Sequence, residues 1–263
     1  MELTCGMDHN LLPIALDESF QFACSPEVPC FNECCRDLNQ FLTPYDILRL
    51  KSHLKLTSGE FLQRYTSRHI GPESGLPIVA LKPSDPYRLT CPFVTAKGCA
   101  VYESRPSSCR IYPLVRAILR SRVTGRINEQ FMILKEPHCL GFNQGRRRTV
   151  GDWVREQGIA DYNENNDSLL EIIRLKNKLH PGPLDIKTEH TFYTTLYDLD
   201  GFRHHLRTMG LSKGFTVDGK LMNRAAGVDD VALLELGIKW IKHLLFKPRF
   251  SGSGFSVPGW KYD

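Results

Sequence analysis

Nine cysteines are the residues of this sequence whose type and spacing could support chemistry. Eight of them form groups along the chain: Cys24, Cys30, Cys34 and Cys35, then Cys91, Cys99 and Cys109, and finally Cys139. Four thiolates can hold a zinc ion tetrahedrally, and four can equally hold the iron atoms of a [4Fe–4S] cluster. Because packing alone hardly explains so many clustered cysteines, the pattern predicts a metal or iron–sulfur site, with Cys5 outside it.

The spacing of the cysteines differs from that of compact metal motifs. The first group reads C-x5-C-x3-C-C and the second C-x7-C-x9-C, whereas zinc knuckles and ferredoxins place two residues between paired cysteines. The ligands must therefore come together from distant segments of a folded scaffold. Adjacent side chains of an extended segment point to opposite faces, so Cys34 and Cys35 reach one centre only if the backbone turns sharply. Otherwise the two thiols face different centres, and both arrangements stay open.

The cellular compartment decides whether these thiols are free. Asp8, Asp17 and Glu18 stand where a secretory signal would need apolar residues, and no uninterrupted apolar run approaches the roughly 18 residues of a membrane span. We therefore expect a cytoplasmic protein that does not enter a membrane. In a reducing compartment clustered cysteines are more often metal ligands or redox groups than disulfides, which remain the alternative for a secreted protein.

Helices and short strands must position the cysteines. Thr43 before Pro44, Thr57 before Glu60, and Thr149 have the spacing of capped helix starts. Short β-like runs are expected at Leu76–Leu81, Tyr87–Val94, Cys99–Tyr102 and Phe131–Leu134. Apolar residues at helical spacing predict helices over Ser168–Leu179 and Val231–Phe246.

These elements indicate an α+β fold, with helices and a small β-sheet around a cysteine-rich metal site. The chain of 263 residues can bury a sizeable core without covalent cross-links. We expect a cysteine-cluster metal-binding domain over residues 20–162. Residues 163–263 contain no cysteine and are expected to form a mainly helical C-terminal extension packed on that domain.

The cysteines also stand in a specific sequence context. The motifs are Phe22-Ala23-Cys24, Cys30, Cys34-Cys35-Arg36, Leu42–Ile47, Cys91–Val94, Gly98–Pro106, Cys109–Pro113 and His138–Gly145. Their order resembles the YkgJ-like cysteine-cluster family over roughly residues 20–162, although Leu140 and Phe142-Asn143 depart from that family's late Cys-Pro-Gly-x-Gly segment. The family is described as a zinc- or iron-chelating domain, so the resemblance implies that this chain binds one of these metals.

Part of the pattern is similar to a second group of proteins. The Cys34-Cys35 pair, Cys91-Pro92-Phe93 and Cys109-Arg110-Ile111-Tyr112-Pro113 resemble the cysteine framework of flagellin lysine N-methylases. This similarity implies an iron–sulfur centre and a methyl-transfer role that would use S-adenosylmethionine. No glycine-rich nucleotide loop after a clear strand supports that role independently.

Basic residues near the cysteines have two interpretations. Arg36, Arg105 and Arg110 are expected to stabilise deprotonated thiol ligands from just outside the metal site, and surface ion pairs or turn contacts are the alternative. Residues 101–150 are rich in arginine, which could attract nucleic acid or an acidic protein. Because aromatic residues are not interleaved with them, we expect a solvated basic face and no nucleic-acid partner.

The sequence as a whole predicts a metal-binding protein with one or two centres. The ligands are expected to be Cys24, Cys30, Cys34, Cys35, Cys91, Cys99, Cys109 and Cys139. Irregular spacing and the wider resemblance favour an iron–sulfur cluster over zinc. Three functions remain open: a structural or metal-chelating module, an iron–sulfur-dependent protein-modifying enzyme such as a protein lysine N-methylase, and a redox or metal-relay protein acting on a protein partner.

Overall fold

The computed structural model describes residues 10–120, 127–212 and 214–246, so that Cys5 lies outside the described residues. The strands are β1 (Leu11–Ile14), β2 (Ser19–Phe22), β3 (Phe41–Leu42), β4 (Thr66–Ile70), β5 (Pro77–Leu81), β6 (Val94–Thr95), β7 (Gly98–Cys99), β8 (Leu114–Arg120), β9 (Ile127–Leu134) and β10 (Phe142–Thr149). The α-helices are α1 (Pro44–Leu54), α2 (Ser58–Tyr65), α3 (Ser107–Ile111), α4 (Val150–Glu156), α5 (Ala160–Leu179), α6 (Ile186–Leu196), α7 (Leu199–Thr208), α8 (Gly219–Ala226) and α9 (Asp230–Phe246). Short 3-10 helices span Glu33–Arg36 and Tyr102–Ser104, and the expected α+β class is confirmed.

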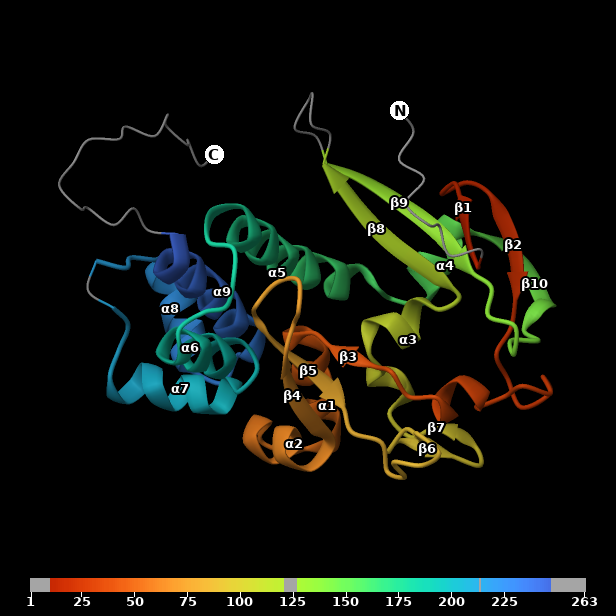
Figure 1. Ribbon diagram of the computed structural model, residues 1–263, viewed down its shortest axis with the longest axis horizontal. Coiled ribbons are helices and arrows are strands. Elements are labelled where there is room, and N and C mark those ends of the chain that lie inside the picture. The colour runs from red at the N-terminus through yellow and green to blue at the C-terminus, as the bar shows by residue number, and fades with distance from the viewer. Residues whose placement is uncertain (1–9, 121–126, 213, 247–263) are drawn as a thin grey trace.

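The strands form several small antiparallel sheets. Strands β1, β9 and β8 make one sheet, β10 pairs with β2, strands β3, β5 and β4 make another sheet, and β6 and β7 form a hairpin. Figure 1 shows β1, β2, β8, β9 and β10 toward one end of the molecule and α6 to α9 toward the other. Helix α1 lies between them and contacts α2, α5 and α9.

The predicted helix starts are confirmed by their caps. The Thr43 hydroxyl accepts a hydrogen bond from the Asp46 amide at 3.2 Å, and the Asp46 carboxylate accepts one from the Thr43 amide at 2.9 Å. Reciprocal caps of the same kind begin α2 at Thr57 and α4 at Thr149. Each cap satisfies amide groups that the first helical turn leaves without a partner, which is why these local signals are reliable.

The predicted strands are confirmed only in part. Strand β5 covers the run expected at Leu76–Leu81 except for Leu76, and the longer β9 contains the run expected at Phe131–Leu134. The strand predicted over Tyr87–Val94 is wrong apart from Val94 and an isolated bridge at Thr90. The Asp85 carboxylate accepts hydrogen bonds from the amides of Tyr87 and Arg88, and these bonds form a turn in place of a strand. The run Cys99–Tyr102 leaves the sheet after Cys99 and enters a 3-10 helix.

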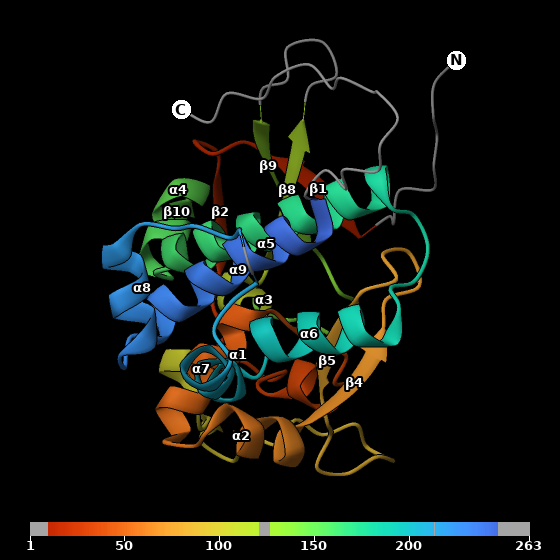
Figure 2. The ribbon, with the colours of Figure 1, turned by 90° about the vertical axis from the view of Figure 1, so that its left-hand side faces the viewer.

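The described residues after Tyr162 are mainly helical, as expected for the C-terminal extension. Helices α5 and α9 contain the two predicted apolar stripes, and they lie side by side in Figure 2. One continuous cluster of buried hydrophobic residues extends from Phe20 to Ile241 and includes side chains of both halves. Among the described helices, none has the length and apolar character needed to cross a membrane.

Buried charges join the C-terminal helices to α1. The Lys51 ammonium lies 2.7 Å from the Asp230 carboxylate and 3.1 Å from Asp200. Asp230 also pairs with Arg203, whose guanidinium donates to the carbonyls of Ala225 and Gly227. Since the Lys51 and Arg203 side chains are only 8% and 11% exposed, these ion pairs are largely shielded from solvent.

Candidate metal centre

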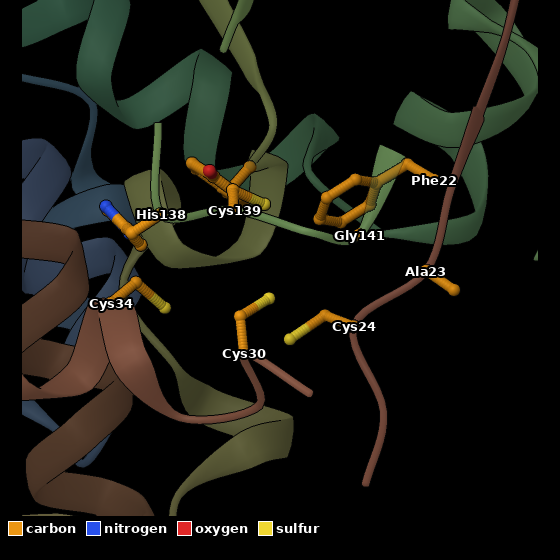
Figure 3. Close-up of a pocket in the computed structure, with 9 residues that line it drawn as sticks. Phe22, Ala23, Cys24, Cys30, Cys34, His138, Cys139 and Gly141 are labelled. Carbon is orange, nitrogen blue, oxygen red and sulfur yellow. The ribbon is translucent and has the colours of Figure 1, made fainter. Parts of the chain in front are cut away.

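A small pocket brings four cysteines together. Figure 3 shows Cys24, Cys30, Cys34 and Cys139 around one space, with Phe22 and Gly141 on one side and His138 near Cys34. We call these four cysteines the pocket set. They come from segments more than a hundred residues apart in the sequence, so only the folded chain can gather them.

Backbone contacts hold the two sides of the pocket against each other. Ala23 lies between the last residue of β2 and Cys24, and its amide donates to the Gly141 carbonyl at 3.0 Å. The Leu140 amide donates to the Cys30 sulfur at 3.1 Å. An amide directed at sulfur stabilises a thiolate and also a thiolate bound to a metal, so this contact suits a ligand.

Gly141 is required for this close approach. A Cβ atom at that position would lie 2.5 Å from the Ala23 carbonyl oxygen and 2.7 Å from the Phe22 ring. Gly141→Ala is therefore expected to push the Cys139 loop away from β2 and to destabilise the protein by about 1–3 kcal/mol in urea unfolding, as overpacking does. Gly59→Ala is the matched control, since a Cβ there meets nothing within 4 Å. An equal loss of unfolding free energy in both variants would contradict the role of Gly141.

The 3-10 helix Glu33–Arg36 separates the vicinal cysteines. Its preceding residue, Asn32, has a left-handed backbone with φ 70°, and the Asn32 carbonyl accepts the Cys35 amide at 3.1 Å. A 3-10 helix has three residues per turn, so successive side chains point about 120° apart. Cys34 accordingly lines the pocket, whereas the Cys35 carbonyl accepts the Cys91 amide at 2.7 Å on another side.

A second set of thiols surrounds Cys35. We call Cys35, Cys91, Cys99 and Cys109 the hairpin set, after the β6–β7 hairpin that Cys91 precedes and Cys99 ends. The Cys35 carbonyl accepts the Cys91 amide, and Cys109 on α3 interacts electrostatically with Cys91 and Cys99. The Cys91 carbonyl accepts the Val94 amide at 3.2 Å, and Val94 pairs with Cys99 across the hairpin. These short links keep Cys91 and Cys99 near each other.

Helix α3 brings Cys109 to the hairpin set. The fully buried Asp46 carboxylate accepts the Ser107 amide at 2.8 Å and so fixes the start of α3 against α1. The Cys109 thiol lies 3.4 Å from the Gln40 side-chain oxygen, to which it donates. The position of Cys109 therefore depends on contacts from two other segments.

Desolvation by surrounding protein atoms dominates the electrostatics of the thiols. It raises the pKa of Cys24 to about 11 although that residue reaches the surface, and the neighbouring thiols Cys34, Cys30 and Cys139 add to the rise. Protein atoms also crowd the Cys109 thiol, although its residue reaches the surface, and this desolvation with the charges of Cys91, Cys34 and Cys99 raises its pKa to about 12. Such thiols stay protonated at neutral pH unless a cation replaces the proton.

Cys34 behaves differently from the other thiols. A hydrogen bond from the Cys35 thiol lowers the pKa of Cys34 to about 7, and the same bond raises the pKa of Cys35. Cys34 also interacts with Cys24 of the pocket set and with Cys91 and Cys109 of the hairpin set. The vicinal pair thus lies where the two sets meet.

Tyr112 adds a polar group to the pocket wall. Its hydroxyl is buried without a well-formed hydrogen bond among the described residues. Burial, and after it the nearby Cys139 thiol and Glu136 carboxylate, raise the pKa of Tyr112. A buried hydroxyl without a partner is costly, so Tyr112 is available as a hydrogen-bond donor to a thiolate or to a sulfur-ligated group in the pocket.

The three arginines expected beside the metal site have different surroundings. Arg105 is buried, donates to the Tyr102 carbonyl at 2.6 Å, and opposes the burial-driven rise in the pKa of Cys24 and of Cys99. Arg110 is also buried and donates to the backbone carbonyls of Gln157 and Glu103. Arg36 forms an exposed ion pair with Glu33 three residues earlier. Arg105 is thus the arginine whose charge acts on both sets of thiols.

The described cysteines are all free thiols. The structure also places His138 in the pocket lining and Gln40 against Cys109, two residues that the sequence did not lead us to include. His138 could have been included because it precedes Cys139, whereas no sequence signal identifies Gln40. Within the described ranges, no group of three or more His, Cys, Asp or Glu side chains already has the arrangement of a formed metal site.

The chemistry of these groups fits a thiophilic metal. Eight thiols, an amide directed at sulfur and a buried hydroxyl without a partner are groups that coordinate or support zinc and iron–sulfur clusters. Comparison with known families agrees: residues 23–140 match the family model described as "Putative zinc- or iron-chelating domain", which confirms the resemblance to a cysteine-cluster family. All eight cysteines of the two sets fall inside the match. No curated protein and no solved structure matches the chain.

Proposed function

We propose, on the premise that residues 23–140 match a zinc- or iron-chelating family, that this protein binds its metal through Cys24, Cys30, Cys34, Cys35, Cys91, Cys99, Cys109 and Cys139. The observation that carries the proposal is the gathering of free thiols from distant segments around the vicinal Cys34-Cys35 pair. The Leu140 amide directed at the Cys30 sulfur and the Tyr112 hydroxyl next to Cys139 support a ligand role for these thiols.

An iron–sulfur cluster is our preferred cofactor, with zinc as the alternative. The pocket is walled by Phe22 and Tyr112, and hydrophobic walls together with hydrogen bonds to sulfur are the features that tune cluster potentials. When bound, such a cluster would supply electron transfer or a structural centre. Cys24 and Cys34 are exposed, so electron exchange with a partner would not need a change of fold.

Purification under anaerobic conditions, followed by metal and sulfide analysis, tests the proposal. We expect brown protein with stoichiometric iron and acid-labile sulfide. A colourless protein with stoichiometric zinc would identify zinc, and not iron, as the bound metal. Protein that contains neither metal, and takes up neither when zinc or iron with sulfide is added, would contradict metal binding altogether. The variant Cys5→Ser is the control, because Cys5 lies outside the family match, and it is expected to keep the full metal content.

Other aspects of the function rest on the sequence. Cytoplasmic location stays our proposal, and the free thiols suit a reducing compartment. Methyl transfer with S-adenosylmethionine and metal relay to a protein partner also stay predictions. A rise in the melting temperature of the metal-loaded protein with S-adenosylmethionine would support the enzyme, since a ligand that binds the folded state stabilises it.

A further inference from the structure

We propose that the eight thiols form two metal sites instead of one, with the pocket set holding one centre and the hairpin set holding the other. The inference rests on the proposed metal-binding function and assigns the ligands within it. The pocket set is Cys24, Cys30, Cys34 and Cys139, and the hairpin set is Cys35, Cys91, Cys99 and Cys109. The boundary between the sites passes between the adjacent residues Cys34 and Cys35.

The backbone of the 3-10 helix is the first argument. Because successive side chains of such a helix differ by about 120° in direction, Cys34 and Cys35 leave the backbone toward different sides, although their thiols hydrogen-bond to each other where the two sets meet. The structure agrees, since Cys34 lines the pocket and Cys35 does not. The helix is anchored on both sides: the Asn32 side-chain amide donates to the Thr95 carbonyl at 3.0 Å, and the Cys35 carbonyl accepts the Cys91 amide.

The pocket set is a complete group of donors by itself. Figure 3 shows its four thiols around one opening, and the segment from Cys139 to Gly141 closes that opening through the Ala23 and Leu140 hydrogen bonds. Four cysteine sulfurs are enough for one zinc ion or one [4Fe–4S] cluster. His138 and Tyr112 also line this pocket and could support its centre.

The hairpin set has its own scaffold. The Cys91 turn leads into β6, Cys99 ends β7, and Cys109 lies on α3, which Asp46 fixes against α1. The Cys35 carbonyl accepts the Cys91 amide at 2.7 Å, and the hairpin register pairs Val94, three residues after Cys91, with Cys99. None of the four hairpin-set cysteines is among the residues that line the pocket.

The charge of the two sites also favours this division. Eight thiolates in one volume would repel one another strongly, whereas two cations or clusters, each with four thiolates, would divide that charge. Arg105 is buried and acts on Cys24 of the pocket set and on Cys99 of the hairpin set. A single guanidinium therefore serves as a common counter-charge for both centres.

Titration of the metal-free, reduced protein with Co²⁺ tests the division. Cobalt in a tetrahedral thiolate site gives intense visible absorption, so each filled site can be counted. We expect the absorption of the wild-type protein to saturate at about two equivalents of Co²⁺. Saturation at one equivalent would overturn the two sites while leaving metal binding intact. Uptake of no Co²⁺, no zinc and no iron would instead contradict the proposed function.

Paired variants assign the ligands. Cys24→Ser with Cys139→Ser is expected to halve the capacity for Co²⁺, and Cys91→Ser with Cys109→Ser is expected to halve it as well. Cys5→Ser should leave it unchanged. Loss of all capacity in either folded double variant would overturn the independence of the sites. Circular dichroism verifies folding, and if a double variant does not fold, the wild-type titration still decides the number of sites.

Discussion

Removal of the bound metal is expected to lower the midpoint of thermal unfolding by about 10 °C. A ligand at a free concentration 1,000 times its dissociation constant stabilises the folded state by about 4 kcal/mol. For chains of roughly this size each kcal/mol corresponds to about 2–4 °C. The thiols come from segments near the start of the chain, from the β6–β7 hairpin, from α3 and from the loop after β9, so the metal would join parts that otherwise depend on packing. Differential scanning calorimetry before and after chelation measures the shift.

The double variant Cys34→Ser with Cys35→Ser is the control for this shift. It removes one thiol from each proposed site, so adding zinc, or iron with sulfide, should no longer raise its melting temperature. Identical midpoints of the wild-type protein with and without bound metal would contradict a stabilising centre, even if metal analysis found the ion.

Asp230→Asn is expected to destabilise the protein by about 3 kcal/mol. Removing one partner of a buried ion pair leaves an uncompensated charge, which commonly costs about 3–5 kcal/mol, and Lys51 here retains Asp200 as a second partner. Arg203 would keep only its contacts to backbone carbonyls. In urea unfolding the midpoint concentration should fall while the slope stays the same, since the substitution changes neither the fold nor the surface that unfolding exposes.

Glu235→Gln on the same helix is the matched control. Glu235 pairs with Lys239 at 2.8 Å, but both side chains are about half exposed. Surface pairs of this kind contribute about 0–1 kcal/mol, so the control should unfold close to the wild-type midpoint. If Asp230→Asn behaves like the control, the buried charges do not hold α9 to α1, and apolar packing alone joins the C-terminal helices to the rest.

Local sequence signals predicted the helix starts well. The caps at Thr43, Thr57 and Thr149 depend on residues within three positions of each other, so no knowledge of the fold was needed. Strand β10 shows the opposite case. It carries Arg146, Arg147 and Arg148, which no strand pattern favours, and its pairing with β2 is supported by a hydrogen bond from Arg148 to the Phe22 carbonyl.

The cysteines of the candidate site were identifiable from type and spacing, but their grouping was not. The alternatives for Cys34 and Cys35 depended on whether the backbone turns, and the left-handed Asn32 and its contact with Thr95 are tertiary features. The burial of the Tyr112 hydroxyl, too, is visible only once the fold surrounds it. Spacing along a chain specifies neighbours in sequence, whereas a metal site is built from neighbours in space.

The pairing of β2 with β10 bears on how the protein can be dissected. The segment that matches the metal-chelating family stops at residue 140, but Phe22 beside Cys24 faces Phe142 in the register, and Phe20 packs on Trp153 of α4. A fragment of residues 23–140 would lack both β2 and β10 and, with Phe22, part of the aromatic wall of the pocket. Biophysical work on the metal chemistry therefore calls for the whole polypeptide, because the matched segment is supported by residues on both sides of it.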